Sequence, residues 1–154
     1  MVDPDNSFLC EIVKRVPIDM IQLQGRESPG RVLNVKDLTG LPVMKAIGIE
    51  KSEDLKISDL YAAVADQLLI DAKQPKDSLL PGGNGLAFDW RLISGKKWDV
   101  PWMLAGGLNA ENVAEAIKTT GTTQIDVSSG VEKLPGQKEL DKITRFIQNA
   151  KKSH

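Results

Sequence analysis

The chain has 154 residues, of which 41% are hydrophobic and 27% charged, and this composition is typical of one globular domain with a buried core. Its 20 basic and 21 acidic residues almost cancel, so no overall field attracts nucleic acid or a membrane, and an anionic ligand needs a local site. A single cysteine and a single histidine exclude a disulfide framework and a cysteine or histidine metal site. We expect one cytoplasmic domain over residues 1–154, because neither a signal peptide nor a membrane-spanning run is visible.

Helix-like and strand-like apolar patterns alternate along the chain. The first helix is expected after the capping candidates Asp5 and Asn6, with its apolar face over residues 8–16. Further helices are expected at 30–38, 52–64, 88–93, from Asn109 onward, and at 140–150. Strands are expected at 18–23, 42–47, 67–70, 102–105 and 124–127, with residues 1–2 as the tail of a sixth. This alternation predicts an α/β fold with a parallel sheet and crossover helices.

The segment from Pro101 to Val131 contains two consecutive copies of one phosphate-binding pattern. In the first copy, a strand enters the turn Gly106–Gly107 and then a helix; in the second, a strand enters Ser128–Ser129–Gly130. Backbone N–H groups freed at such turns, and the partial positive charge of a helix N-terminus, can hold a phosphate group. Each turn taken alone could be only a tight turn. Two adjacent copies at the end of an α/β chain are typical of a (βα)8 barrel.

Three strands carry a charged residue within them or at their ends: Lys45, Asp71 and Asp126. Charges in such places are costly unless they face a polar cavity, and ligands of parallel sheets bind at the carboxyl ends of strands. We therefore expect the three side chains to converge on one site, in preference to unrelated capping or ion-pair roles. Asp71 is the candidate general acid, since a carboxyl group at the mouth of an apolar strand can donate a proton near neutral pH. Spacing alone leaves a capping or turn role for Asp71 equally open.

The loop from Ala72 to Ala87 is long and rich in glycine and proline, and its place after Asp71 favours an active-site lid over a merely mobile connection. Its GGNG run at 82–85 lacks the preceding strand of a dinucleotide-binding fingerprint. Cys10 is expected on a helix surface rather than as a nucleophile, because no histidine accompanies it.

Six segments together resemble the phosphoribosylanthranilate isomerase family and occur in the family's order over nearly the whole chain. The three segments nearest the C-terminus are together highly specific. The FDW and DVSSGVE sequences within them argue against another phosphate-binding barrel such as indole-glycerol-phosphate synthase. The segments are IQLQGRES (21–28), PVMKAIGI (42–49), LLIDA (68–72), GGNGLAFDW (82–90), LAGGLNAENV (104–113) and IDVSSGVEKLPGQKELDKI (125–143).

The resemblance implies an aldose–ketose isomerase of tryptophan biosynthesis, an intramolecular oxidoreductase that needs no metal or organic cofactor. It converts N-(5-phosphoribosyl)anthranilate to 1-(2-carboxyphenylamino)-1-deoxyribulose 5-phosphate by an Amadori rearrangement. A general acid opens the ribose ring to an iminium, and a general base removes the proton from C2. By motif match, Asp71 is the acid and Asp126 contacts the substrate. The same match places one group of residues in the loops around the substrate and its phosphate: Gly83, Gly106, Gly107, Ser129 and Gly130.

Departures from the family pattern are equally informative. The family's general base is a cysteine in a KxCG motif, and neither this motif nor the arginine expected for the anthranilate carboxylate has a counterpart here. Gln24 stands in QLQG where the family usually has QLHG. We therefore expect an N-terminally truncated barrel of about six strands, lacking the first two βα units, with little isomerase activity as an isolated chain.

Three explanations remain open for the missing units. The sequence is a fragment or begins at an internal methionine, which we favour; it is one piece of a two-chain enzyme; or it is a noncatalytic remnant that binds phosphate. Unpaired edges of a barrel lacking two strands would favour self-association or a complementing N-terminal segment as partners. We expect a small sugar phosphate as ligand, and neither a nucleic acid nor a membrane.

Overall fold

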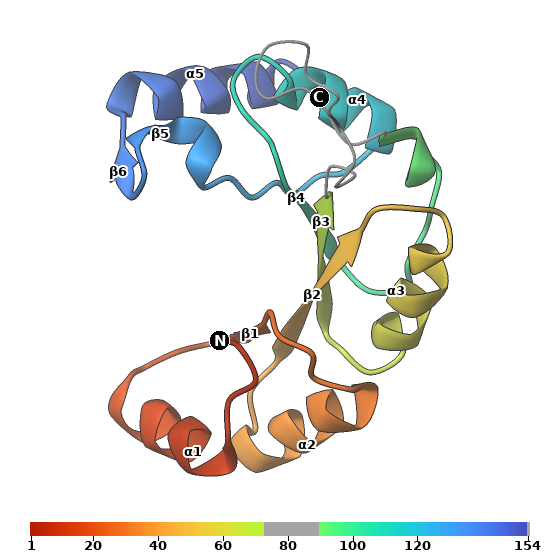
Figure 1. The fold of residues 1–154 in the computed structure, drawn as a ribbon, viewed down its shortest axis with the longest axis vertical. Coiled ribbons are helices and arrows are strands. Elements are labelled where there is room, and N and C mark those ends of the chain that lie inside the picture. The colour runs from red at the N-terminus through yellow and green to blue at the C-terminus, as the bar shows by residue number, and fades with distance from the viewer. Residues whose placement is uncertain (73–89, 154) are drawn as a thin grey trace.

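A computed structural model describes residues 1–72 and 90–153 of the chain. A parallel sheet with the strand order β1-β2-β3-β4 lies at its centre. The strands are β1 (Ile21–Leu23), β2 (Val43–Ile49), β3 (Gln67–Ala72) and β4 (Trp102–Ala105). Figure 1 shows the helices along the outer side of an arc that does not close into a barrel. The predicted α/β architecture, with a parallel sheet and crossover helices, is confirmed.

The first two helices begin at residues whose side chains cap them. The Asp5 side chain accepts a hydrogen bond from the backbone N–H of Phe8 at 2.8 Å, and Ser28 caps the next helix through the N–H of Arg31 at 3.2 Å. None of the described helices is long and apolar enough to cross a membrane. The helices are α1 (Asn6–Arg15), α2 (Pro29–Thr39), α3 (Asp54–Ala62), α4 (Val113–Thr120) and α5 (Leu140–Lys151), with the short 3₁₀ turns η1 (Trp90–Leu92) and η2 (Ser129–Val131).

The expected count of about six strands is corrected at both edges of the sheet. Segment 124–127 makes one isolated parallel bridge, Leu104 to Ile125, before the chain turns into η2. At the other edge, Met1 donates to the carbonyl of Gln22 at 2.6 Å and accepts from the N–H of Gln24 at 2.8 Å. Both segments follow the sheet edges but do not form regular strands. A hairpin that the sequence did not predict follows η2, formed by β5 (Glu132–Leu134) and β6 (Gln137–Lys138).

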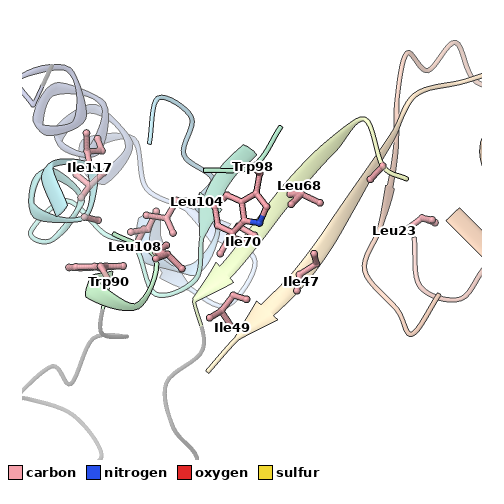
Figure 2. Close-up of a cluster of buried hydrophobic side chains, with 14 of the residues drawn as sticks. Leu23, Ile47, Ile49, Leu68, Ile70, Trp90, Trp98, Leu104, Leu108 and Ile117 are labelled. Carbon is pink, nitrogen blue, oxygen red and sulfur yellow. The ribbon is translucent and has the colours of Figure 1, made fainter. Parts of the chain in front are cut away.

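The two faces of the sheet have different surroundings. Side chains of alternate strand residues point toward the helices and form the main core, in which Ile47, Leu68, Ile70 and Leu104 are buried (Figure 2). The residues between them face the inner side of the arc, where Leu69 belongs to a second, smaller cluster. Strand parity therefore separates a helix-facing layer from an inner face that is free to form a binding site.

Lys45 and Glu27 form an ion pair in the helix-facing layer, where their side chains are only 3% and 1% exposed. The Lys45 ammonium donates to a Glu27 carboxylate oxygen at 2.9 Å and to the carbonyl of Gly25 at 2.9 Å. The other carboxylate oxygen accepts the backbone N–H groups of Asp3 and Gly25. The Tyr61 hydroxyl donates to the carbonyl of Glu27 at 2.8 Å. The pair thus ties the N-terminus and the β1–α2 loop to β2 and α3.

Replacing Lys45 with Met should destabilise the fold strongly, because it leaves the Glu27 carboxylate buried without its cation. We expect a loss of about 3–5 kcal/mol in the free energy of unfolding, measured by urea denaturation. The control is Arg15→Met, which removes an exposed pair with Glu11 and should cost less than about 1 kcal/mol. Equal losses for the two variants would contradict the structural role of the buried pair.

The same pair predicts a pH dependence. Burial acts to raise the pKa of Glu27, but the hydrogen bond and charge of Lys45, with two backbone donors, bring the pKa below its usual value. Because the folded-state pKa is the lower one, the stabilisation is present above the unfolded pKa of about 4.3 and is lost as the pH falls through the folded pKa. The stability difference between the unsubstituted chain and Lys45→Met should therefore shrink below about pH 4 in urea titrations. A difference independent of pH would contradict this assignment.

Candidate active site

A pocket of about 430 Å³ opens at the carboxyl ends of the strands, on the inner side of the arc. This is the edge at which parallel α/β sheets bind ligands. Its lining comes from the ends of β2, β3 and β4, from the residue after β1, and from the segment that follows the bridge at Ile125. The lining residues are Gln24, Ala46, Ile47, Gly48, Leu69, Asp71, Ala105, Gly106, Gly107, Leu108, Asp126, Val127, Ser128 and Ser129.

Parallel pairing brings the two acidic side chains to this pocket. Asp71 pairs with Gly48 of β2 on one side and with Ala105 of β4 on the other. The N–H of Asp126 donates to the carbonyl of Leu104 at 2.8 Å, which aligns the next segment with the end of β4. Asp71 is half-buried and Asp126 is exposed, and both line the pocket. The predicted convergence of these two carboxylates is confirmed.

Lys45 does not join them, and the expectation of a three-residue site including it is wrong. It lies in the helix-facing layer with Val43 and Ile47, and it is held by Glu27. Buried charges need partners, and here the partner is a carboxylate across the loop rather than a ligand. Lys45 shares the strand parity of Val43 and Ile47, but parity alone does not show which of the two sheet faces packs against the helices.

The first predicted phosphate turn has the backbone that glycine permits. Gly106 and Gly107 have φ values of 90° and 62°, in the left-handed region that favours glycine. After them, Asn109 and Asn112 cap the chain reciprocally: each side-chain oxygen accepts the backbone N–H of the other, at 3.0 and 2.9 Å. The Asn112 amide also donates to the carbonyl of Gly107 at 3.0 Å. The Asn109 side chain therefore caps the turn before α4, whereas the N-cap of α4 itself is Asn112 and the helix begins at Val113, later than the sequence predicts.

The second predicted turn is packed directly against the first. A Cβ added to Gly130 would lie 1.8 Å from the carbonyl oxygen of Leu108, so only glycine allows this approach of two backbones. Ser129 lines the pocket, whereas Gly130 lies at the contact between the turns. The turn continues into a three-residue 3₁₀ segment rather than a regular helix. The two turns nevertheless meet at one end of the pocket, as the repeated pattern predicts.

Several other sequence expectations have distinct outcomes. Cys10 is exposed on α1 and does not line the pocket. Gln24 does line it, at the end of β1. Gly83 and the loop expected to act as a lid lie outside the described residues. Gly48 lines the pocket and was not predicted; a glycine inside an apolar strand often marks a close approach of another group and was the available signal.

The chemistry offered by the described lining is acidic and rich in backbone donors. Asp71 and Asp126 are its ionisable side chains, and no lysine, arginine or histidine is among the described lining residues. Backbone N–H groups and hydroxyls at glycine and serine turns are groups that can hold an anion without a cationic side chain. The same pocket offers the carboxyl group of Asp71, beside Ala105 of β4, for proton transfer.

Comparisons with known proteins identify the family. The family model for N-(5'-phosphoribosyl)anthranilate isomerase matches residues 1–149. The isomerase of a Ruegeria species is 56% identical over 97% of this chain and 70% of its own length, and that of Paracoccus denitrificans is 56% identical over 97% and 69%. The chain thus spans about 70% of these relatives.

Solved structures show the same likeness. The isomerase of Thermotoga maritima superposes with a TM-score of 0.84 at 33% identity, over 99% of this chain and 71% of that one. A phosphoribosylanthranilate isomerase in complex with reduced 1-(o-carboxyphenylamino)-1-deoxyribulose 5-phosphate has a TM-score of 0.80 at 30% identity, over 99% and 69%. On the family match and the identity to these relatives, the chain belongs to the N-(5'-phosphoribosyl)anthranilate isomerase family.

Proposed function

We propose that this chain binds N-(5'-phosphoribosyl)anthranilate in the described pocket and takes part in its isomerisation to 1-(2-carboxyphenylamino)-1-deoxyribulose 5-phosphate, a step of tryptophan biosynthesis. One observation carries the proposal: a single pocket joins the Asp71 carboxyl to two glycine and serine turns that touch each other. A sugar phosphate has a matching layout, with an anionic end and a ring whose oxygen accepts a proton. Membership of the isomerase family supports the same reaction.

In this proposal Asp71 is the general acid. It protonates the ring oxygen of the ribose, the C1–O bond breaks, and the nitrogen lone pair forms the iminium. Removal of the C2 proton then gives an enolamine, which tautomerises to the ketone without any external oxidant. Asp126 also lines the pocket, and we assign it a contact with the substrate. Proton transfer by a positioned carboxyl group supports this assignment in physical terms.

The phosphate is assigned to the backbone N–H groups of Gly106, Gly107, Ser129 and Gly130. Left-handed glycines turn successive N–H groups toward one concave side, which is a favourable arrangement for an anion. The contact between Leu108 and Gly130 fixes the distance between the two donor sets. Gly83 remains a predicted substrate contact from the resemblance alone.

The chain does not supply the family's general base, which is a cysteine. Its single cysteine, Cys10, lies on α1 and does not line the pocket. We propose that the base comes from a complementing segment or a second chain that pairs with the open edges of the sheet, as expected for an N-terminally truncated barrel. The chain alone should then bind the substrate and turn it over weakly. The noncatalytic phosphate-binding alternative predicts binding with no turnover under any complementation.

Turnover by the purified chain tests whether the general acid and the general base come from different segments. We expect slow conversion of phosphoribosylanthranilate by the 154-residue chain, measured by the change in fluorescence of the N-linked anthranilate group. Fusion to a segment carrying the family's KxCG motif should raise the rate by about 10²–10⁴-fold, as a positioned general base does. Full activity of the chain alone would contradict the assignment of the base to another segment.

Asp71→Asn tests the acid. In the fused, active protein we expect turnover to fall by about 10²–10⁴-fold, because the amide cannot donate the proton that opens the ring. Binding of inorganic phosphate should not weaken, because the phosphate turns are untouched and the change removes a negative charge from the pocket. Asp19→Asn, at an exposed position outside the pocket, is the matched control. Retained turnover in Asp71→Asn would remove this residue from the acid role.

Gly130→Ala tests the contact between the turns. The new methyl group would meet the Leu108 backbone, so the two turns must separate. We expect phosphate affinity to fall by about tenfold or more in calorimetric titration, with a loss of roughly 1–3 kcal/mol in stability from overpacking. Gly30→Ala, whose Cβ would meet only the Ser28 hydroxyl at 3.9 Å, should leave affinity unchanged. Unchanged affinity in Gly130→Ala would contradict the shared phosphate site.

A further inference from the structure

Lys138 makes an unusual set of contacts beside the second phosphate turn. It lies on β6 of the hairpin, and its ammonium donates to the Ser128 carbonyl at 2.8 Å and to the Ser128 hydroxyl oxygen at 2.9 Å. The third contact is the Glu132 carboxylate at 2.7 Å. A lysine ammonium has three hydrogens, so these acceptors use all of them and fix the ammonium in one position.

These contacts also determine whether the Ser128 hydroxyl donates to Lys138 or accepts from it. The hydroxyl has one hydrogen to donate and two lone pairs to accept. Since Lys138 has no lone pair, the hydroxyl oxygen accepts from it, and the Ser128 hydrogen must point elsewhere. Ser128 lines the pocket, so its hydroxyl is available there as a donor to an anion.

Charge supports the same direction. The ionisable side chains among the described lining residues are two carboxylates, Asp71 and Asp126, and they repel a phosphate dianion. Lys138 places a cation one hydrogen bond behind the lining, at Ser128. A cation that donates to a hydroxyl also polarises that hydroxyl, so the hydroxyl becomes a better donor.

We propose that Lys138 is a positioning residue of the phosphate site: it orients the Ser128 hydroxyl toward the bound phosphate and holds the Ser128 carbonyl out of its way. This inference rests on the proposed function, in which the turns at 106–107 and 128–130 bind the phosphate. It adds a side-chain donor to the backbone donors. The hairpin brings Lys138 back to a residue ten positions earlier in the chain.

The test is a double-mutant cycle with inorganic phosphate as the probe, measured by isothermal titration calorimetry. Lys138→Met and Ser128→Ala should each weaken binding by about tenfold. The double variant should also bind phosphate about tenfold more weakly than the unsubstituted chain, and no more weakly than that, because both changes remove the same interaction. Lys133→Met, an exposed lysine on the same hairpin, is the charge-matched control and should stay within about twofold.

The variant Glu132→Gln tests whether Lys138 acts by positioning Ser128 or only by stabilising the hairpin. This change weakens the contact of Lys138 with β5 but leaves both of its bonds to Ser128 in place. Phosphate affinity within about twofold of the unsubstituted chain supports the proposal. A loss of phosphate affinity as large as that of Lys138→Met would overturn the proposal and show that Lys138 only stabilises the hairpin.

The remaining outcomes also decide. Additive losses in the cycle, about a hundredfold for the double variant, would show that Lys138 acts independently of Ser128 and would overturn the inference. Undiminished binding by Lys138→Met would overturn it too. If the unsubstituted chain shows no saturable phosphate binding, the proposed phosphate site itself fails, and the role of Lys138 fails with it.

Discussion

Parallel pairing of β3 with its two neighbours determines the position of each residue in the proposed site. The register sets Asp71 opposite Gly48 on one side and Ala105 on the other. The bridge between Leu104 and Ile125 then carries the alignment one segment further. Backbone hydrogen bonds, rather than side-chain contacts, therefore deliver the acid and both phosphate turns to one end of the molecule. The side chains on the helix-facing layer of the sheet pack against the helices, as Figure 2 shows.

The pocket combines requirements that conflict electrostatically. It must hold an anionic group and also keep carboxyl groups close enough to transfer a proton. The proposed site assigns these functions to different groups: backbone N–H groups of the two turns, which touch where Gly130 meets the Leu108 carbonyl, hold the anion, and the Asp71 carboxyl group at the end of β3 transfers the proton. Backbone donors provide a partial positive charge that does not titrate. Lys138 reinforces them from behind the lining, where it leaves room for the ligand.

Sequence patterns predicted most of this arrangement because local chemistry dictates it. The alternation of strands and helices, the Asp5 cap and the paired turns all follow from interactions between residues near one another in the chain. Parity also placed Asp71 correctly, but it could not identify which sheet face holds the site. Lys45 was therefore assigned to the pocket, whereas Glu27, 18 residues earlier, holds it in the core. The Lys138 contact depends likewise on a hairpin fold that short-range periodicity does not reveal.

The most direct measurement of the central claim is a crystal structure of this chain with reduced 1-(o-carboxyphenylamino)-1-deoxyribulose 5-phosphate, a compound already bound in a related isomerase. We predict that its phosphate lies between the turn at Gly106–Gly107 and the turn at Ser128–Gly130, within hydrogen-bond distance of their N–H groups. The ribulose chain should extend toward Asp71. A phosphate bound at any other surface, or a ligand whose sugar points away from Asp71, would contradict the proposed site.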